Sequence, residues 1–306
     1  MSLGVFGLVR NEAQWIAFSI LSMKDFVSEF VYFDGNSTDG TLELLDYIRS
    51  KYGLQIKVFK GMDPKNLKDD YVRMFNECLG QVKSDYAAFI HPDMICVKGP
   101  DRPFTELAYK VNMRSFGGDP HGEIVEITEG RSGKWKSIMK NDYGLHYHGH
   151  YGTSNEDLYF RDITGDQHEV YQALALLPNG HELNSPGRDG AHNENSSQEV
   201  YKEVVLFPYE VGESGIELYH YSDVRPYSRR LSRMITCIVN ENPGFNREMA
   251  KELAITHPRV SLQPGGPFGN FKFKPIGDSP SVFTRYLPEI AGVLGKKEEE
   301  LCWVLG

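Results

Sequence analysis

The chain has 306 residues and a formal net charge of −9, with 42 Asp and Glu against 33 Lys and Arg. Hydrophobic residues make up 40% and aromatic residues 12%, which is typical of globular proteins and excludes a disordered or fibrous chain. The acidic balance argues against a nucleic-acid partner, because surfaces that follow phosphates need an excess of basic residues. The sequence contains no run of 18 apolar residues, so it predicts no transmembrane segment.

The N-terminus and the cysteines bear on the compartment. The first dozen residues lack the basic and apolar regions of a secretory signal. The four cysteines, at positions 78, 96, 237 and 302, form no C-x-x-C pair, which disfavours both a zinc ribbon and a disulfide framework. These features predict a cytoplasmic protein.

The first hundred residues alternate between strand and helix patterns. Short apolar or alternating runs predict four strands, at 4–9, 30–33, 54–58 and 86–90. Apolar residues recur at helical spacing in each of the three intervals between these runs. Strands separated by helices predict βαβ units and a mostly parallel sheet with helices beside it.

Beyond residue 100 the patterns are weaker. Strands are predicted at 123–128, 137–139, 203–207 and 216–220, and a helix at 225–239. Residues 178–198 are rich in Gly, Pro, Asn and Ser, which is typical of a loop. The remaining tail is expected to hold short helices around proline-rich connections.

Polar residues follow three of the predicted strands, namely Arg10, Asp34 and Asp93. Ligands of open α/β sheets bind at the carboxyl ends of the strands, so we expect a site there. The segment from Asp34 to Thr41, D-G-N-S-T-D-G-T, joins a carboxylate that suits a ribose or base edge to a helix N-terminus that suits a phosphate. An ordinary capped turn is the alternative interpretation of this segment.

The segment His91-Pro92-Asp93 places a carboxylate after the fourth strand. A diphosphate can settle beside carboxylates only if a divalent cation lies between them. Asp93 is therefore a candidate ligand of Mg²⁺ or Mn²⁺, and the neighbouring His91 favours Mn²⁺. The alternative is a turn that merely ends the strand.

Four segments in this order resemble a family 2 glycosyltransferase of the GT-A fold: Val9 to Glu12, Asp34 to Thr41, Arg73 with Asn76, and Asp85 to Asp93. The resemblance covers roughly residues 3–98. It implies inverting transfer of a sugar from a nucleotide-diphosphate donor, expected to be a UDP-sugar, to a hydroxyl acceptor with the help of Mn²⁺ or Mg²⁺. It also implies a set of nucleotide-binding residues: Val9, Arg10, Glu12, Asp34, Ser37, Asp39 and Arg73.

The same resemblance assigns a metal site. Where the family usually has D-x-D, this chain has His91-Pro92-Asp93, so Asp93 corresponds to the metal-binding aspartate and His91 replaces the first one. The later segment Leu218 to Ser222 resembles the element whose histidine completes the metal site, which makes His220 a ligand of metal or diphosphate. The arginines at 225, 229 and 230 could clamp phosphate.

The base and the acceptor residues are expected in the middle of the chain. The segment from Glu156 and Asp157 to Arg161 resembles the family's E-D followed by Arg, so Asp157 is the expected base and Glu156 an acceptor contact. Glu182, in an H-E pair, is the competing base. His148 and Tyr151 belong to an aromatic and histidine-rich stretch that could line an acceptor groove or simply form a polar strand face.

The expected organisation is a GT-A domain over residues 1–222 and a helical extension over residues 223–306. Within the domain, residues 1–98 would bind the nucleotide and residues 99–222 the acceptor, in polysaccharide biosynthesis. Two other functions fit the same sheet. One is a catalytically silent protein that binds carbohydrate or nucleotide. The other is a sugar-phosphate nucleotidyltransferase, which would need a glycine-rich basic loop after the first strand, where the chain instead has Leu8 to Glu12.

Overall fold

The structure of the chain is a computed structural model. It describes residues 1–60, 67–106, 108–119, 124–129, 133–141, 146–148, 157–161, 167–169, 211–225, 227–241, 244–262, 272–275 and 279–301.

The N-terminal half alternates strands and helices, as the sequence predicts. The elements are β1 (Leu3–Val9), α1 (Ile16–Met23), β2 (Glu29–Asp34), α2 (Thr41–Tyr52), β3 (Ile56–Lys60), α3 (Leu67–Gln81) and β4 (Tyr86–Phe89). The four strands lie in the order β3-β2-β1-β4, and each neighbouring pair is parallel. Val9, Asp34 and Lys60 are register partners, so β1, β2 and β3 end at the same level of the sheet.

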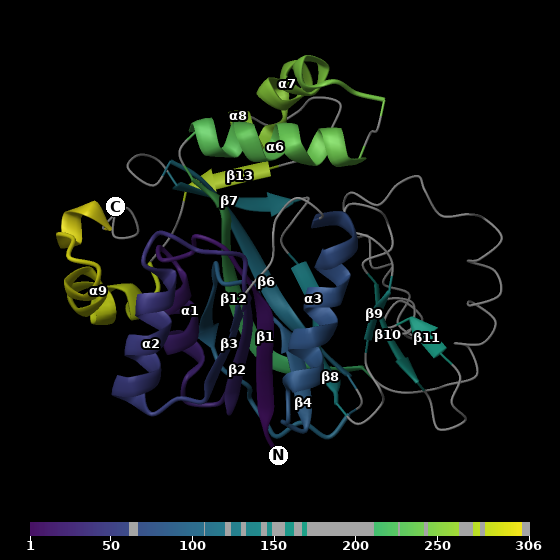
Figure 1. The fold of residues 1–306 in the computed structure, drawn as a ribbon, viewed down its shortest axis with the longest axis vertical. Coiled ribbons are helices and arrows are strands. Elements are labelled where there is room, and N and C mark those ends of the chain that lie inside the picture. Colours follow the sequence, from purple (N-terminus) through teal and green to yellow (C-terminus); the bar gives the residue numbers. More distant parts are fainter. Residues whose placement is uncertain are drawn as a thin grey trace.

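The chain then widens this sheet with strands of both directions. They are β5 (Met94–Lys98), β6 (Ala108–Gly118), β7 (Ile124–Glu129), β8 (Gly133–Lys140), β12 (Val211–Val224) and β13 (Lys272–Pro275). The path continues from β4 through β8, β6 and β7 to β13, with antiparallel pairing at each step. β12 pairs parallel with β6 and antiparallel with β5. Its carboxyl end therefore lies at the same edge as those of β1 and β2 (Figure 1).

A second, small sheet contains β9 (His146–His148), β10 (Asp157–Arg161) and β11 (Gln167–Glu169). Both of its strand pairs are antiparallel. β9 lies against α3, which places this sheet beside the helix that covers one face of the main sheet.

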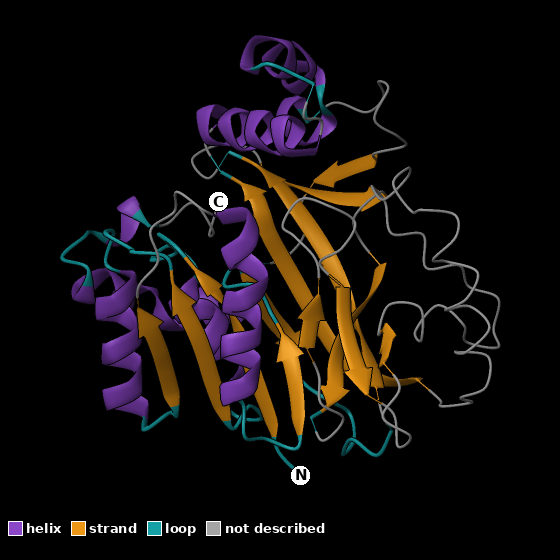
Figure 2. Ribbon diagram, turned by 45° about the vertical axis from the view of Figure 1, so that its right-hand side comes forward, coloured by secondary structure: helices purple, strands orange, loops and turns teal. Residues whose placement is uncertain are grey.

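The C-terminal part supplies two groups of helices. The helices α6 (Tyr227–Glu241), α7 (Arg247–Thr256) and α8 (Pro258–Ser261) pack on one another, while α9 (Ser281–Val293), followed by the 3₁₀ helix η2 (Glu298–Glu300), packs on α1 and α2. Figure 2 shows the first group at one end of the sheet, and Figure 1 shows α9 beside α1 and α2. The predicted helical tail thus also contributes a strand, β13, to the central sheet.

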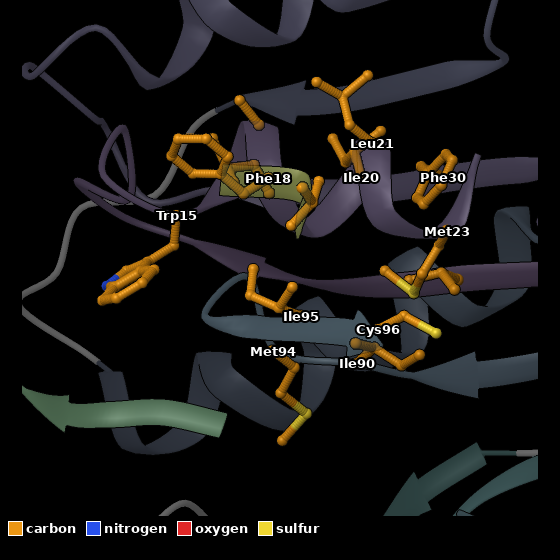
Figure 3. Packing of buried hydrophobic residues seen from close by; sticks show 14 of the residues in the cluster. Trp15, Phe18, Ile20, Leu21, Met23, Phe30, Ile90, Met94, Ile95 and Cys96 are labelled. Carbon is orange, nitrogen blue, oxygen red and sulfur yellow. The ribbon is translucent and has the colours of Figure 1, made fainter. Parts of the chain in front are cut away.

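Alternation along the strands explains why helices cover both faces of the sheet. Side chains of a strand point to opposite faces in turn. Val5, Phe30 and Tyr32 belong to the large core cluster under α1, α2 and α9, whereas Phe6 and Val31 pack with the buried face of α3. A strand buried on both sides is continuously apolar, which is the pattern that made β1 and β2 predictable. Figure 3 shows side chains of α1 and β5 meeting in the larger cluster.

Several predicted elements shift or extend in the structure. The strand expected at 54–58 is β3, which begins at Ile56, and the strand expected at 216–220 is the middle of the longer β12. β5, β6 and β13 are strands that the sequence patterns did not indicate. The predicted loop 178–198 and the predicted strand 203–207 lie outside the described residues. Within the described part of the chain, no helix is long and apolar enough to cross a membrane.

The packing of α9 gives a first prediction. Phe283 is 0% exposed and contacts the ring of Phe18 edge-on at a centroid distance of 4.9 Å. Replacing it in Phe283→Ala removes a large buried ring and leaves a cavity, so we expect the free energy of unfolding to fall by about 3–5 kcal/mol. Urea denaturation measures this. The matched variant Ile255→Ala, at a residue that is 43% exposed, should lose far less. Equal losses in the two variants would mean that α9 is not part of the main core.

Candidate functional site

The site is built first by two loops that follow neighbouring parallel strands. The loop after β1 and the loop after β2 meet at the carboxyl edge of the sheet, where Gly35 N donates to Val9 O at 2.8 Å. In the other direction, three backbone amides of the first loop donate to side chains of the second: Asn11 to Ser37 Oγ at 2.9 Å, Glu12 to Thr41 Oγ1 at 2.9 Å, and Ala13 to Asp39 Oδ2 at 3.0 Å. The segment from Asp34 to Thr41 therefore holds the first loop in place.

Two asparagines let these loops turn sharply. Asn11 and Asn36 have φ angles of 56° and 61°, in the left-handed region that asparagine tolerates better than most residues. The side chain of Asn11 also accepts a hydrogen bond from Thr38 N at 2.8 Å. Asparagine at position 11 thus serves both the turn and the contact between the loops.

The side chains of Asp34, at the end of β2, and Asp39, in the second loop, form hydrogen bonds within the protein. Asp34 is 1% exposed, and its carboxylate accepts a hydrogen bond from Ser37 N at 3.1 Å. Asp39 accepts from Ala13 N, and its other oxygen accepts from Thr41 N at 3.1 Å and from the Thr41 hydroxyl at 2.5 Å. Among the residues predicted to bind nucleotide, these two and Ser37 are engaged in loop structure, whereas Arg10 is exposed and lies over Gly35.

A second cluster forms around Asp93, in the turn between β4 and β5. Asp93 is 5% exposed, and its backbone carbonyl accepts a hydrogen bond from Tyr221 N at 2.9 Å, across the pairing of β5 with β12. Its Oδ1 atom lies 3.4 Å from His220 Nε2. The rings of His91 and His220 stack with centroids 5.6 Å apart. The three residues predicted to hold a metal are therefore neighbours.

Arg225 connects the two clusters. It follows β12 directly, and its Nη2 atom lies 3.4 Å from Glu12 Oε1 and 3.4 Å from Asp93 Oδ2. Glu12 belongs to the loop after β1, so this guanidinium joins the first loop, the β4–β5 turn and the end of β12. The sequence predicted Arg225 only as a phosphate clamp, because spacing alone does not show which carboxylates a distant arginine will meet.

Burial and charge set the protonation of this cluster. Burial opposes ionisation of Asp93, but the neighbouring His220, His91 and Arg225 outweigh it and lower its pKa from the ordinary value. Burial dominates at Glu12 and, against the attraction of Arg225, raises its pKa to about 7. Asp93 is consequently the firmly charged carboxylate, and Glu12 is the one that titrates near neutrality.

The other two candidate arginines differ from Arg225. Arg230 is 7% exposed and donates to the carbonyls of Gly118, Arg225 and Val260, which joins α6 to the end of β6 and to α8. Burial lowers its pKa. Arg229 is exposed on the first turn of α6. Arg230 thus helps to hold α6 against the end of β6 and α8, and its phosphate contact stays a prediction.

The remaining predicted site residues are only partly placed. Arg73 lies in the first part of α3, of which only the backbone is described. Asp157 of β10 and His148 of β9 are register partners in the small sheet. Glu156, Tyr151 and Glu182 lie outside the described residues. The predicted base and one predicted acceptor residue therefore share a pair of strands.

Behind the cluster lies an aromatic group that the sequence patterns did not indicate. The ring of Tyr221, next to His220, stacks on Trp15 at 4.9 Å, and Phe283 of α9 packs on Tyr221 at 5.7 Å. Trp15 and Phe283 are 268 positions apart in the chain, as their numbers give, so no local pattern could reveal their contact. This group joins the residue before α1 to β12 and α9 behind the predicted metal ligand.

The donor set can be compared with what a divalent cation needs. Among the described residues, no group of three His, Cys, Asp or Glu side chains is placed to hold a metal. Asp93 Oδ1 and His220 Nε2, 3.4 Å apart, are compatible with two ligands of one ion at about 2.1 Å each. Mg²⁺ typically binds through one or two carboxylates together with substrate phosphates, so this partial set fits a cation that arrives with a phosphate ligand.

A separate hollow lies away from these residues. It has a volume of about 410 Å³ and opens at the far end of β5, where Lys98, Arg102 and Glu217 are among its lining residues. None of the predicted site residues lines it.

Comparisons with known proteins give matches only among solved structures. No protein-family model and no curated protein sequence matches the chain. Similar structures include S. aureus TarS 1-349 in complex with UDP-GlcNAc, with 11% identity, a TM-score of 0.38 and coverage of 82% of this chain and 69% of that chain. Another is the mannosyltransferase PcManGT from Pyrobaculum calidifontis in complex with GDP-Man and Mn²⁺, with 11% identity, a TM-score of 0.36 and coverage of 85% and 73%.

A longer S. aureus TarS chain has 14% identity and a TM-score of 0.35, and the similarity covers 83% of this chain but only 42% of that one. Similarity at this level identifies neither a family nor an activity for the present chain.

The raised pKa of Glu12 predicts how stability depends on pH. A carboxyl group whose pKa is about 7 when folded and 4.5 when unfolded stabilises the fold below pH 4.5, and that contribution is lost as the pH rises to 7. We therefore expect the wild type to lose about 3 kcal/mol over this range relative to Glu12→Gln, whose neutral amide does not titrate.

Urea denaturation of both proteins between pH 5 and pH 8 measures this difference. The variant Glu43→Gln, at an exposed residue of α2, is the matched control and should follow the wild type. Parallel curves for the wild type and Glu12→Gln would show that Glu12 does not titrate in this range.

Proposed function

We propose that the chain is a glycosyltransferase that moves a sugar from a nucleotide-diphosphate donor, a UDP-sugar in the first instance, to a hydroxyl acceptor with inversion. The resemblance of its first 98 residues to family 2 glycosyltransferases supports this function. So does the position of the candidate site at the carboxyl edge of a sheet with parallel β3, β2, β1 and β4, which is where α/β proteins bind nucleotides.

The observation that carries the proposal is the charged, buried carboxylate of Asp93. It lies at the carboxyl edge next to His220 and is joined through Arg225 to the loop after β1. Burying an ionised carboxylate is unfavourable unless charged partners compensate it, so a protein that keeps one at a ligand-binding edge has a use for its charge. Recruiting a cation together with a diphosphate is the use that fits these neighbours.

We assign the divalent cation, Mn²⁺ or Mg²⁺, to Asp93 and His220, with His91 beside them. When bound, it would neutralise the charge that develops on the departing diphosphate. The chain's own residues would do the rest: the joined loops after β1 and β2 would hold the nucleotide, and exposed Arg10 would attract its phosphates.

The transfer itself requires a base. The acceptor hydroxyl oxygen would attack the anomeric carbon from the side opposite the diphosphate, and the sugar–phosphate bond would break with its electron pair leaving on the nucleoside diphosphate. Asp157 would take the hydroxyl proton. Its place on β10, paired with His148 of β9, supports an acceptor groove along the small sheet. Holding donor and acceptor in line would supply much of the rate.

One set of contacts favours a second function, a catalytically silent nucleotide-binding protein of the same fold. Asp34 and Asp39 accept hydrogen bonds from their own loops, and Arg225 already compensates Asp93. A site whose charges are satisfied internally can bind without catalysing. Slow hydrolysis of a UDP-sugar in the presence of Mn²⁺ would exclude this function.

The metal assignment can be tested by nucleotide binding. We expect Mn²⁺ to tighten UDP binding by the wild type at least tenfold in calorimetric titration, and we expect Asp93→Asn to lose that effect because the amide carries no charge. The variant Asp101→Asn, at an exposed aspartate beyond β5, is the control and should retain it. Unchanged Mn²⁺ dependence in a folded Asp93→Asn protein would remove Asp93 from the metal site.

The base assignment makes a different prediction. In Asp157→Asn we expect UDP binding within about twofold of the wild type and a loss of transfer of about 10²-fold or more, because the amide cannot accept the proton. Transfer is measured as UDP released in the presence of acceptor sugars. Full turnover by this variant would place the base elsewhere, with Glu182 as the next residue to change.

A further inference from the structure

The guanidinium of Arg225 lies between the buried carboxylate of Asp93 and the half-buried carboxylate of Glu12. Its Nη2 atom is 3.4 Å from Glu12 Oε1 and 3.4 Å from Asp93 Oδ2, and the three side chains are between 7% and 15% exposed. Each carboxylate turns one oxygen to Arg225 and keeps the other away from it. Asp93 Oδ1 faces His220, and Glu12 Oε2 is buried without a hydrogen-bond partner among the described residues.

The backbone that carries this guanidinium is firmly held. Arg225 N donates to Gly118 O at 3.1 Å, and Arg225 O accepts from Arg230 Nη1 at 2.6 Å. The carbonyl of Ser222 accepts from Arg225 Nε and from Arg233 Nη1, both at 3.0 Å. These bonds hold the Arg225 backbone and the Nε atom of its guanidinium, so movement at this point is confined to the Nη atoms at the end of the side chain.

The contacts at that end are loose. Hydrogen bonds between a guanidinium and a carboxylate usually measure about 2.7–2.9 Å and are often bidentate. Arg225 instead reaches both carboxylates with a single nitrogen at 3.4 Å. It supplies positive charge to both of them without a close hydrogen bond to either. Its close hydrogen bond, from Nε to Ser222 O at 3.0 Å, need not break when the Nη atoms turn from a carboxylate to another anion.

A divalent ion on Asp93 and His220 would compete with this guanidinium. Two cations confined to one buried site repel each other strongly, because little water is present to screen them. The ion and Arg225 would also share Asp93, whose two oxygens are directed to His220 and Arg225 respectively. Strong binding of the ion therefore requires Arg225 to find another anion.

From these contacts we infer that Arg225 is an exchangeable counter-ion. In the donor-free protein it neutralises Glu12 and Asp93, and it leaves Asp93 for the diphosphate when a divalent cation and a nucleotide bind together. This inference rests on the proposed function. Its consequence is that the free protein holds a divalent cation weakly, so that cation and donor load as a pair.

Cation binding without nucleotide provides the test. Mn²⁺ affinity is measured by electron paramagnetic resonance for the wild type, for Arg225→Gln and for Arg247→Gln, a control at an exposed arginine of α7. We expect Arg225→Gln to bind Mn²⁺ at least tenfold more tightly than the wild type, because the competing charge is gone, and the control to match the wild type. Equal or weaker binding by a folded Arg225→Gln protein overturns the inference.

A second measurement uses the unaltered chain, in case Arg225→Gln does not fold. In a crystal structure with UDP and Mn²⁺, we expect Arg225 Nη2 to lie beyond 4 Å from Asp93 Oδ2 and to contact the diphosphate. Persistence of the 3.4 Å contact with both ligands bound overturns the exchange while leaving the proposed function intact. If UDP binds but Mn²⁺ never does, the cation assignment fails, and the inference fails with it.

Discussion

The ion cluster of Glu12, Arg225 and Asp93, of which Arg225 and Asp93 are buried, is the interaction on which the candidate site depends. Three parts of the chain meet in it: the loop after β1, the turn before β5 and the residue after β12. Separately, each charge would be strongly disfavoured away from water, so the cluster forms only when all three parts are in place. Folding the second half of the chain onto the first is thereby linked to completing the site.

The loops at the carboxyl edge illustrate how one sequence motif can serve two purposes. The D-G-N-S-T-D-G-T segment resembles a nucleotide-binding motif. Its side chains of Ser37, Asp39 and Thr41 nevertheless accept hydrogen bonds from backbone amides of the neighbouring loop. These hydrogen bonds organise the edge before any ligand is present. A loop held in this way loses little conformational freedom on binding, which favours affinity for whatever occupies the site.

Some strands of the fold follow from local sequence patterns, and others form only through contacts between distant parts of the chain. β1, β2 and β4 were predictable because strands buried on both faces are continuously apolar, and the helices between them repeat their apolar residues every three or four positions. β6 and β13 were not, because each pairs with a strand that is distant in the sequence, β6 with β12 and β13 with β7, and this pairing selects the strand conformation. Strand formation depends on neighbours more than helix formation does.

For the candidate site, the sequence by itself determined which chemical groups stand at the strand ends: Asp34, Asp93 and, through the family resemblance, His220. Only the tertiary structure decided what those groups touch. The Asp34 carboxylate accepts a hydrogen bond from the loop that follows it, and Asp93 lies between His220 and Arg225. The physical reason is that a parallel sheet brings strand ends together through register, whereas the partner of a buried charge depends on packing between segments more than a hundred residues apart.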